Sequence, residues 1–227
     1  MTTFLNIFMI MAMVIGLSGR PTLAMNPVKN CHCFKKRSYN PAEKSGSDPY
    51  LLTTTTNSFI SSRFGFDKKK IVMMKMKGGI GSDDLLIGLY LVSLTKVPIQ
   101  ELMDQRQQGV PWKTILLREG FRSIVKGDAI LASLHQGIEA SRGAEQITDL
   151  LASYFFSVEP ATINSLRARN FSSKELTLLL TLATKSQIDV QLLADLAQKQ
   201  KLSYSEIAFN LGFQPGDMKT IIREIKP

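Results

Sequence analysis

The residues best suited to chemistry are Cys31, His32 and Cys33, which stand together and include both cysteines of the chain. Thiolates and imidazoles bind zinc and copper, and a Cys-x-Cys pair can chelate a soft ion such as Cu(I). Zinc sites usually draw four ligands from separated pairs, but the only other histidine is His135. Two close thiols seldom stay free in an oxidising compartment. We therefore favour a Cys31–Cys33 disulfide and keep a metal site at Cys31, His32 and Cys33 as the alternative.

Other catalytic or cofactor-binding patterns are missing from the sequence. The glycines of 78–81 are not followed by the Lys-Ser/Thr pair of a phosphate loop. Asp83 and Asp84 are adjacent, so they diverge around a helix, and they are typical of a helix start. His135 is typical of a polar helix face or of a hydrogen-bonded core position. We therefore expect no enzyme activity and no bound cofactor.

The first 24 residues predict export. Phe4–Leu17 is apolar apart from Asn6, and its 14 residues are too few to span a bilayer, which takes about 20. That length is typical of the hydrophobic region of a signal peptide. Small residues at Thr22 and Ala24 suit signal peptidase, so we expect cleavage after Ala24. The mature protein would then be periplasmic or secreted and would have no transmembrane span.

Residues 25–47 show neither a helical nor a strand period. We expect an irregular basic arm that lies over the core and buries its aromatic rings. Interleaved cations and rings can instead bind nucleic acid. The whole chain has a formal charge of +9 and a pI near 9.6, which favours an anionic partner or simply a well-solvated surface. The charged residues of the arm are Lys29, Lys35, Lys36, Arg37, Glu43 and Lys44.

Residues 48–227 carry the signals of a helical domain. Asp48 is a good N-cap, and Pro49 is favoured at the first helical position. From residue 67 the chain shows a weak repeat whose unit starts are spaced by 31, 30, 31 and 30 residues. Each start is a residue that favours a helix N-terminus. These starts are Asp67, Pro98, Asp128, Glu159 and Asp189.

Each unit is expected to contain a short helix, a turn and a second helix. Residues 98–115 align with 159–176 at a constant offset of 61. Such units cannot bury their apolar faces alone, but stacked neighbours can. The predicted fold is all-α, with tandem two-helix units of about 30 residues in a solenoid-like or compact helical array. The turns are expected at Gly78-Gly79, Gly109, Gly143, Asn170 and Lys201, and the second helices open at Asp84-Leu85, Thr114-Ile115, Gln146-Ile147, Glu175-Leu176 and Glu206-Ile207.

The last unit contains the runs Ser203–Ala208, Leu211–Phe213 and Pro215–Lys219, followed by Arg223. This stretch resembles the helix-turn-helix of bacterial regulators such as sigma-factor region 4 and response-regulator output domains. In those families the second helix enters the DNA major groove, which here implies the helix 216–225. The resemblance implies DNA contacts from Lys219, Thr220 and Arg223.

This DNA-binding alternative requires a cytosolic chain, as would follow if Met25 were the true start. An export signal opposes it, and Asp217 near the start of the second helix would repel phosphate. The pattern also encodes a tight helix–Gly–helix corner that any packed helix pair can use. We prefer export, because an untranslated stretch would rarely mimic a hydrophobic region and a cleavage site together.

The motifs Asn30–Phe34, Ser38-Tyr39, Asp48–Tyr50 and Lys75–Gly78 resemble those of a family of uncharacterised exported bacterial proteins. This resemblance implies export and brings no activity with it. Combined with the repeat and the missing catalytic patterns, it leads to the hypothesis of a macromolecule-binding module. Its partner would be another protein or an anionic polymer, with nucleic acid disfavoured by export.

The two cysteines provide a direct test of the compartment. We expect Cys31 and Cys33 to form a disulfide in the mature exported protein. A loop with one intervening residue removes little chain entropy, so reduction should cost the lower end of the roughly 0–5 kcal/mol range and leave the helices folded. Thiol counting without reductant, followed by thermal melts with and without it, measures both effects. Two free thiols would contradict the disulfide and support the metal site.

Overall fold

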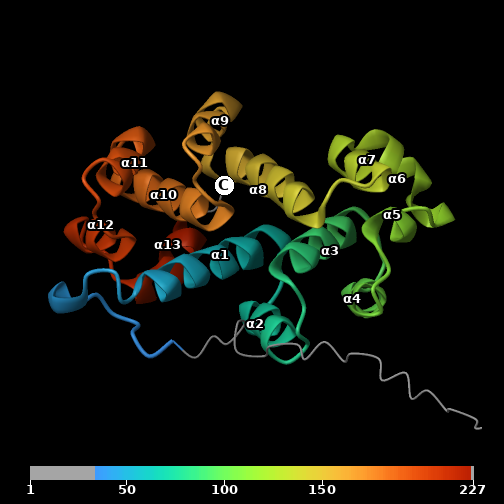
Figure 1. Cartoon of the computed structure of the whole chain (residues 1–227), viewed down its shortest axis with the longest axis horizontal. Helices are drawn as coiled ribbons and strands as arrows, with labels where there is room; N and C mark the ends of the chain where they lie inside the picture. The colour runs from blue at the N-terminus through green and yellow to red at the C-terminus, as the bar shows by residue number, and fades with distance from the viewer. Residues whose placement is uncertain (1–33, 226–227) are drawn as a thin grey trace, which may run out of the picture.

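The computed structural model describes residues 34–225, and within them it contains thirteen α-helices, short 3₁₀ segments and no strand (Figure 1). The predicted all-α fold is confirmed. No helix in this part of the chain has both the length and the apolar character needed to cross a bilayer. The helices are α1 (Asp48–Phe64), α2 (Lys68–Met76), α3 (Ser82–Leu94), α4 (Ile99–Gln107), α5 (Trp112–Ile115), α6 (Arg122–Gly127), α7 (Ala129–Gln136), α8 (Ala140–Phe156), α9 (Pro160–Ala168), α10 (Ser173–Ser186), α11 (Val190–Gln198), α12 (Tyr204–Asn210) and α13 (Met218–Glu224).

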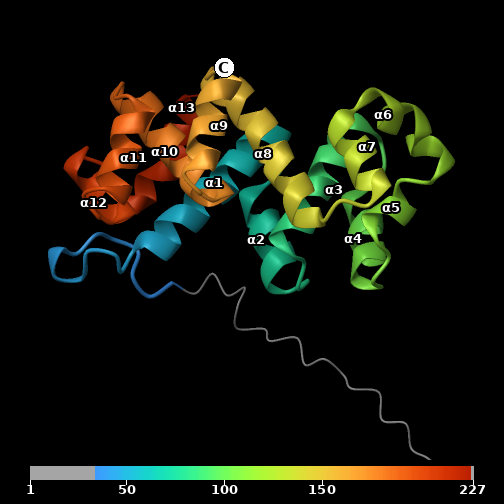
Figure 2. The same cartoon turned by 45° about the horizontal axis from the view of Figure 1, so that its top comes forward.

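Helix α1 runs through the middle of the molecule and packs against α2, α3, α10, α12 and α13. It begins at Asp48 with a proline in its first turn and ends at Gly65, whose φ of 60° lies in the left-handed region that glycine adopts without strain. Its Phe59 ring meets Phe155 edge-on at 5.3 Å and stacks on Phe156 at 5.7 Å between ring centroids. These contacts join α1 to the C-terminal end of α8. Helices α4–α7 gather at one end of the molecule and α10–α13 at the other (Figure 2).

All five predicted unit starts are N-terminal caps, of α2, α4, α7, α9 and α11 in turn. The carboxylates of Asp67, Asp128 and Asp189 each accept a hydrogen bond from a backbone N–H in the first turn, which satisfies donors that the helix leaves open. The regular stacking of these units is not confirmed. Helix α3 packs against α8, and the second helix predicted for the second unit is divided into the short helices α5 and α6.

The two units that align at the offset of 61 share one arginine contact. Arg106 in the last turn of α4 corresponds to Arg167 in the last turn of α9. Each guanidinium donates to the backbone carbonyl four residues ahead, at 2.6 and 2.9 Å. Each also pairs with a carboxylate on the preceding long helix, Asp84 at 2.8 Å for Arg106 and Asp149 at 2.7 Å for Arg167. The same side chain therefore fixes the short helix to its neighbour in both units.

The third unit contradicts two of the predicted boundaries. The turn expected at Gly143 and the helix start expected at Gln146-Ile147 are both wrong, because the chain turns at Gly137, with a φ of 102°, and α8 begins at Ala140. Gly143 lies inside α8 and is buried. It is a packing residue, since its missing side chain makes room for Leu134 of α7.

The described part of the arm lies against the C-terminal unit. The Tyr39 ring stacks on Phe209 of α12 at 4.6 Å, and the Lys44 amine pairs with Glu206 at 2.6 Å. At the start of α1, the Asp48 carboxylate accepts hydrogen bonds from the backbone N–H of Ser205 at 2.7 Å and from that of Tyr204 at 3.2 Å. The beginning and the end of the described chain are thus joined.

Gly143→Ala tests the packing role of this glycine. An added Cβ would lie 2.6 Å from Cδ2 and 3.0 Å from Cγ of Leu134, so α7 and α8 must separate or Leu134 must change rotamer. We expect the free energy of unfolding to fall by about 1–3 kcal/mol in urea denaturation. The control is Gly127→Ala in α6, where a Cβ meets open space. Equal stability of the two variants would contradict the packing role.

Candidate functional site

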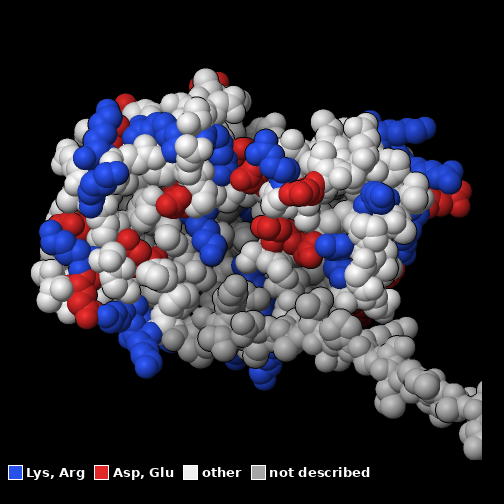
Figure 3. All heavy atoms as spheres, in the orientation of Figure 1, with Lys and Arg blue, Asp and Glu red and all other residues white. Residues whose placement is uncertain are grey.

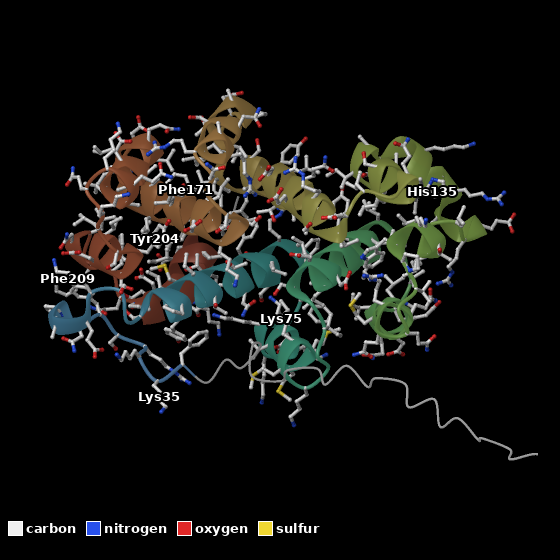
Figure 4. All side chains as sticks on the ribbon, viewed as in Figure 1. Lys35, Lys75, His135, Phe171, Tyr204 and Phe209 are labelled. Carbon is white, nitrogen blue, oxygen red and sulfur yellow. The ribbon has the colours of Figure 1, made fainter. Side chains whose placement is uncertain are left out.

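The structure does not place the predicted metal or disulfide residues. Cys31, His32 and Cys33 lie outside the described residues, so both hypotheses stay predictions. His135 lies half-buried on α7, at the end of the molecule formed by α4–α7 (Figure 4). In the range 34–225 no three His, Cys, Asp or Glu side chains come together as a metal site would require.

The predicted DNA-contacting residues all lie on α13. Lys219, Thr220 and Arg223 are exposed, while the opposite face of the helix is buried against α1. The helix expected over 216–225 is a 3₁₀ turn followed by α13, and the Asp217 carboxylate accepts from the backbone N–H of Gln214 at 2.8 Å. DNA binding stays a prediction.

A cavity of about 500 Å³, which we call the central cavity, lies where α1, α2, α3, α8 and α10 meet. The first turns of α3, α8 and α10 all reach it. Exposed residues of those turns form its rim: Ser82, Asp83, Ser141, Ser172 and Lys174. Buried side chains form its floor: Asn57, Phe59, Ile60, Lys75, Leu86, Ala144, Thr148 and Thr177.

Lys75 is the most unusual residue of the cavity. It lies in the last turn of α2, is only 6% exposed, and donates from Nζ to the neutral amide oxygen of Asn57 at 2.9 Å. Among residues 34–225 it has no carboxylate within ion-pair distance. Burial and, to a smaller extent, the positive charge of Lys174 lower the pKa of Lys75 to about 8, while Asp83 acts in the opposite direction. Figure 4 shows Lys75 on the side of α2 that faces α1.

Asp83 lines the same cavity from the first turn of α3. Burial raises the pKa of the Asp83 carboxyl, and the neighbouring carboxylates of Asp84 and Glu145 raise it further, while Lys75 and Lys174 oppose them. Asp83 and Lys174 make no ion pair with any described residue, and Glu145 pairs with Arg142 at 2.7 Å. The cavity is therefore lined by the positive charges of Lys75 and Lys174 and the negative charge of Asp83, and these three groups form no ion pair with one another.

Three of the four threonines that line the cavity already donate their hydroxyl hydrogen within their own helix. Thr56, Thr148 and Thr177 each donate their hydroxyl hydrogen to a carbonyl of their own helix, at 2.9, 2.8 and 2.7 Å. A hydroxyl has one hydrogen, so toward a ligand these groups can only accept. Lys75 has two further N–H groups beyond its bond to Asn57. The two lysines are thus the cavity's main cationic donors.

Fold and site together define an all-α protein with a buried lysine facing a central polar cavity. No family model matches the chain, and neither a curated protein nor a solved structure matches it. Its function must therefore be inferred from the geometry of the cavity.

The lowered pKa of Lys75 predicts a pH-dependent stability. Between about pH 8 and the ordinary lysine pKa of 10.5, the unfolded chain keeps this proton while the folded protein has released it. Stability therefore rises with pH across that window. The rise in the free energy of unfolding should be larger in the wild type than in Lys75→Met, by roughly 2–3 kcal/mol. Urea denaturation at intervals across this window measures the difference.

The matched control for this experiment is Lys70→Met, at an exposed position of the same helix. Its stability should follow pH in parallel with the wild type. If Lys75→Met also runs parallel to the wild type, burial does not disfavour the charged amine, and the description of the cavity floor is wrong.

Proposed function

We propose that this protein is a binding protein whose central cavity holds a small polar organic molecule. The observation that carries this proposal is Lys75, a buried amine without a carboxylate partner among the described residues, facing a cavity of about 500 Å³. Burying an unpaired ammonium costs stability, and such groups gather at functional sites.

The size and lining of the cavity fit this proposal. Ligand pockets typically enclose about 300–1,000 Å³ and combine apolar walls with a few polar groups. Here Phe59, Ile60 and Leu86 supply apolar contact on the floor, and Lys75 and Lys174 supply cations. A ligand with an anionic group and a short apolar part would satisfy both kinds of contact.

Macromolecule binding along stacked units, with another protein or an anionic polymer as the partner, stays a prediction. Lys and Arg side chains lie intermixed with Asp and Glu over the face shown in Figure 3, without a large region of one sign. The net charge of +9 is therefore not gathered on this face into a surface for a polyanion. The small-molecule cavity has the more specific structural support. We further propose that the protein acts after export, in the periplasm or outside the cell, as the first 24 residues predict.

The test uses a substitution that fills the cavity. Thr56 lines it from α1, and Thr56→Trp would place an indole in the space proposed for the ligand. A panel of small carboxylates, amino acids and oxo acids is screened against the wild type by ligand-observed NMR and thermal unfolding. We expect at least one compound to bind and to stabilise the protein, by about 2.7 kcal/mol when present at a hundred times its Kd. The same compound should not bind to Thr56→Trp.

The matched control is Thr184→Trp, at an exposed position of α10 away from the cavity. This variant should bind like the wild type. Binding that survives in Thr56→Trp, or a panel in which no compound binds the wild type, would contradict a ligand site in the central cavity.

A further inference from the structure

The surroundings of Lys75 suit a neutral amine better than an ammonium ion. Its one hydrogen-bond acceptor within the described residues is the uncharged amide of Asn57, at 2.9 Å. Phe59, Ile60 and Leu86 form the apolar part of the floor, and Lys174 adds a like charge from α10. Lysines become nucleophiles in proteins under these two conditions, desolvation and a neighbouring cation.

Lys44 shows the opposite case in the same protein. Its amine is exposed and pairs with Glu206 at 2.6 Å, and this hydrogen bond raises the pKa of Lys44. A carboxylate in contact keeps an amine protonated and unreactive toward carbon. Lys75 has no such contact among the described residues, and it opens onto a cavity large enough for a second molecule.

Lys68 has some of these features, but it lines a different pocket. It lies on the same helix, and burial lowers its pKa to about 8 as well. Its amine donates to the hydroxyls of Thr54 and Ser58, both at 2.7 Å, which leaves one N–H. It lines a separate, more open pocket of about 640 Å³ together with Asp67, Lys69 and Lys219, and does not reach the central cavity.

We propose that the Lys75 amine captures a small oxo acid in the central cavity as a covalent imine. This inference rests on the proposed function, since the cavity must first admit the compound. The carboxylate of the oxo acid would pair with Lys174 at the rim, and its carbonyl carbon would reach the Lys75 amine on the floor. Phe59, Ile60 and Leu86 on the floor limit the access of the water that would otherwise hydrolyse the imine.

The chemistry needs no partner beyond the oxo acid. The lone pair of the Lys75 nitrogen forms a bond to the carbonyl carbon, and the carbonyl oxygen takes up a proton, which gives a carbinolamine. Loss of a proton from nitrogen and of the hydroxyl group as water then leaves a C=N bond. One amine and one carbonyl are converted to one imine and one water, without oxidation or reduction. We assign the transfer of a proton from nitrogen to the departing hydroxyl group to Asp83, whose carboxyl group lines the same cavity.

The experiment uses pyruvate as the probe, with sodium cyanoborohydride to reduce any imine to a stable secondary amine. The full chain is treated across a pH series, and modified residues are located by peptide mass spectrometry. At pH 8, we expect Lys75 to be modified roughly 100-fold faster than lysines with an ordinary pKa, since half of it is neutral there. Modification should reach half its maximum near pH 8.

Variants separate the role of the cavity from that of the pKa. Lys68→Met should leave modification of Lys75 unchanged, and Lys68 in the wild type should be modified at least about tenfold less than Lys75, because two hydroxyls hold its amine and the pocket beside it is more open. Equal modification of Lys68 and Lys75 would overturn the proposal. Circular dichroism and the unfolding curve of each variant establish that it is folded.

Lys174→Gln tests how the oxo acid is recognised. It should raise the pyruvate concentration needed for half-modification at least about fivefold. Modification by propanal, which has no carboxylate, should slow only as far as loss of the Lys174 charge raises the pKa of Lys75, and the pH series with propanal measures that shift. Loss of both reactions to the same degree would overturn the pairing of Lys174 with the carboxylate. Binding of compounds in the NMR panel without any adduct on Lys75 would overturn the imine and leave the proposed function standing. Absence of both binding and adduct would overturn the two together.

Discussion

The burial of α1 on nearly all sides is the constraint on which the rest of the structure depends. Five other helices pack against it, yet its buried residues include Thr54, Thr55, Asn57 and Ser58. A buried polar group needs a hydrogen-bond partner, because leaving it unpaired costs about 1–3 kcal/mol. The hydroxyls of Thr55 and Ser58 donate to carbonyls one turn earlier in α1. The other partners come from α2, whose lysines donate to Thr54, Asn57 and Ser58.

This arrangement explains the presence of a lysine at the floor of the central cavity. Helix α2 is short, and only its face toward α1 is buried, at Ile71 and Lys75. Its lysines, Lys68 and Lys75, donate hydrogen bonds to the buried polar side chains of α1. The bond from Lys75 to Asn57 also places the Lys75 amine beside the space between α3, α8 and α10. The rim of that space consists of helix starts, where serine and aspartate are favoured for local reasons. The same short-range preference that begins these helices therefore makes the rim polar.

The parts of the fold that could be predicted from sequence are those set by neighbouring residues. Asp67, Asp128 and Asp189 mark helix starts because a carboxylate two or three positions before an open N–H caps it. The turn predicted at Gly143 is wrong because glycine is common both in turns and at close contacts between helices. Only the position of Leu134 in the folded chain decides between the two. The central place of α1 was hidden by its threonine run, which is a poor helix former in isolation and is held by tertiary packing. The candidate site could not be recognised, since its charged residues lie on α2, α3, α8 and α10 and look in sequence like ordinary surface residues.

The junction between the arm, the start of α1 and α12 has a consequence for the order of folding. Asp48 binds Ser205, and α1 also packs against α13, so the central helix finds these partners more than 150 residues later in the chain. Contacts between distant residues form late, because the loop between them must first be closed. A chain emerging from the ribosome cannot complete its core until its last two helices have been made. Helix α1 therefore lacks two of its packing partners until nearly the whole described chain has been made.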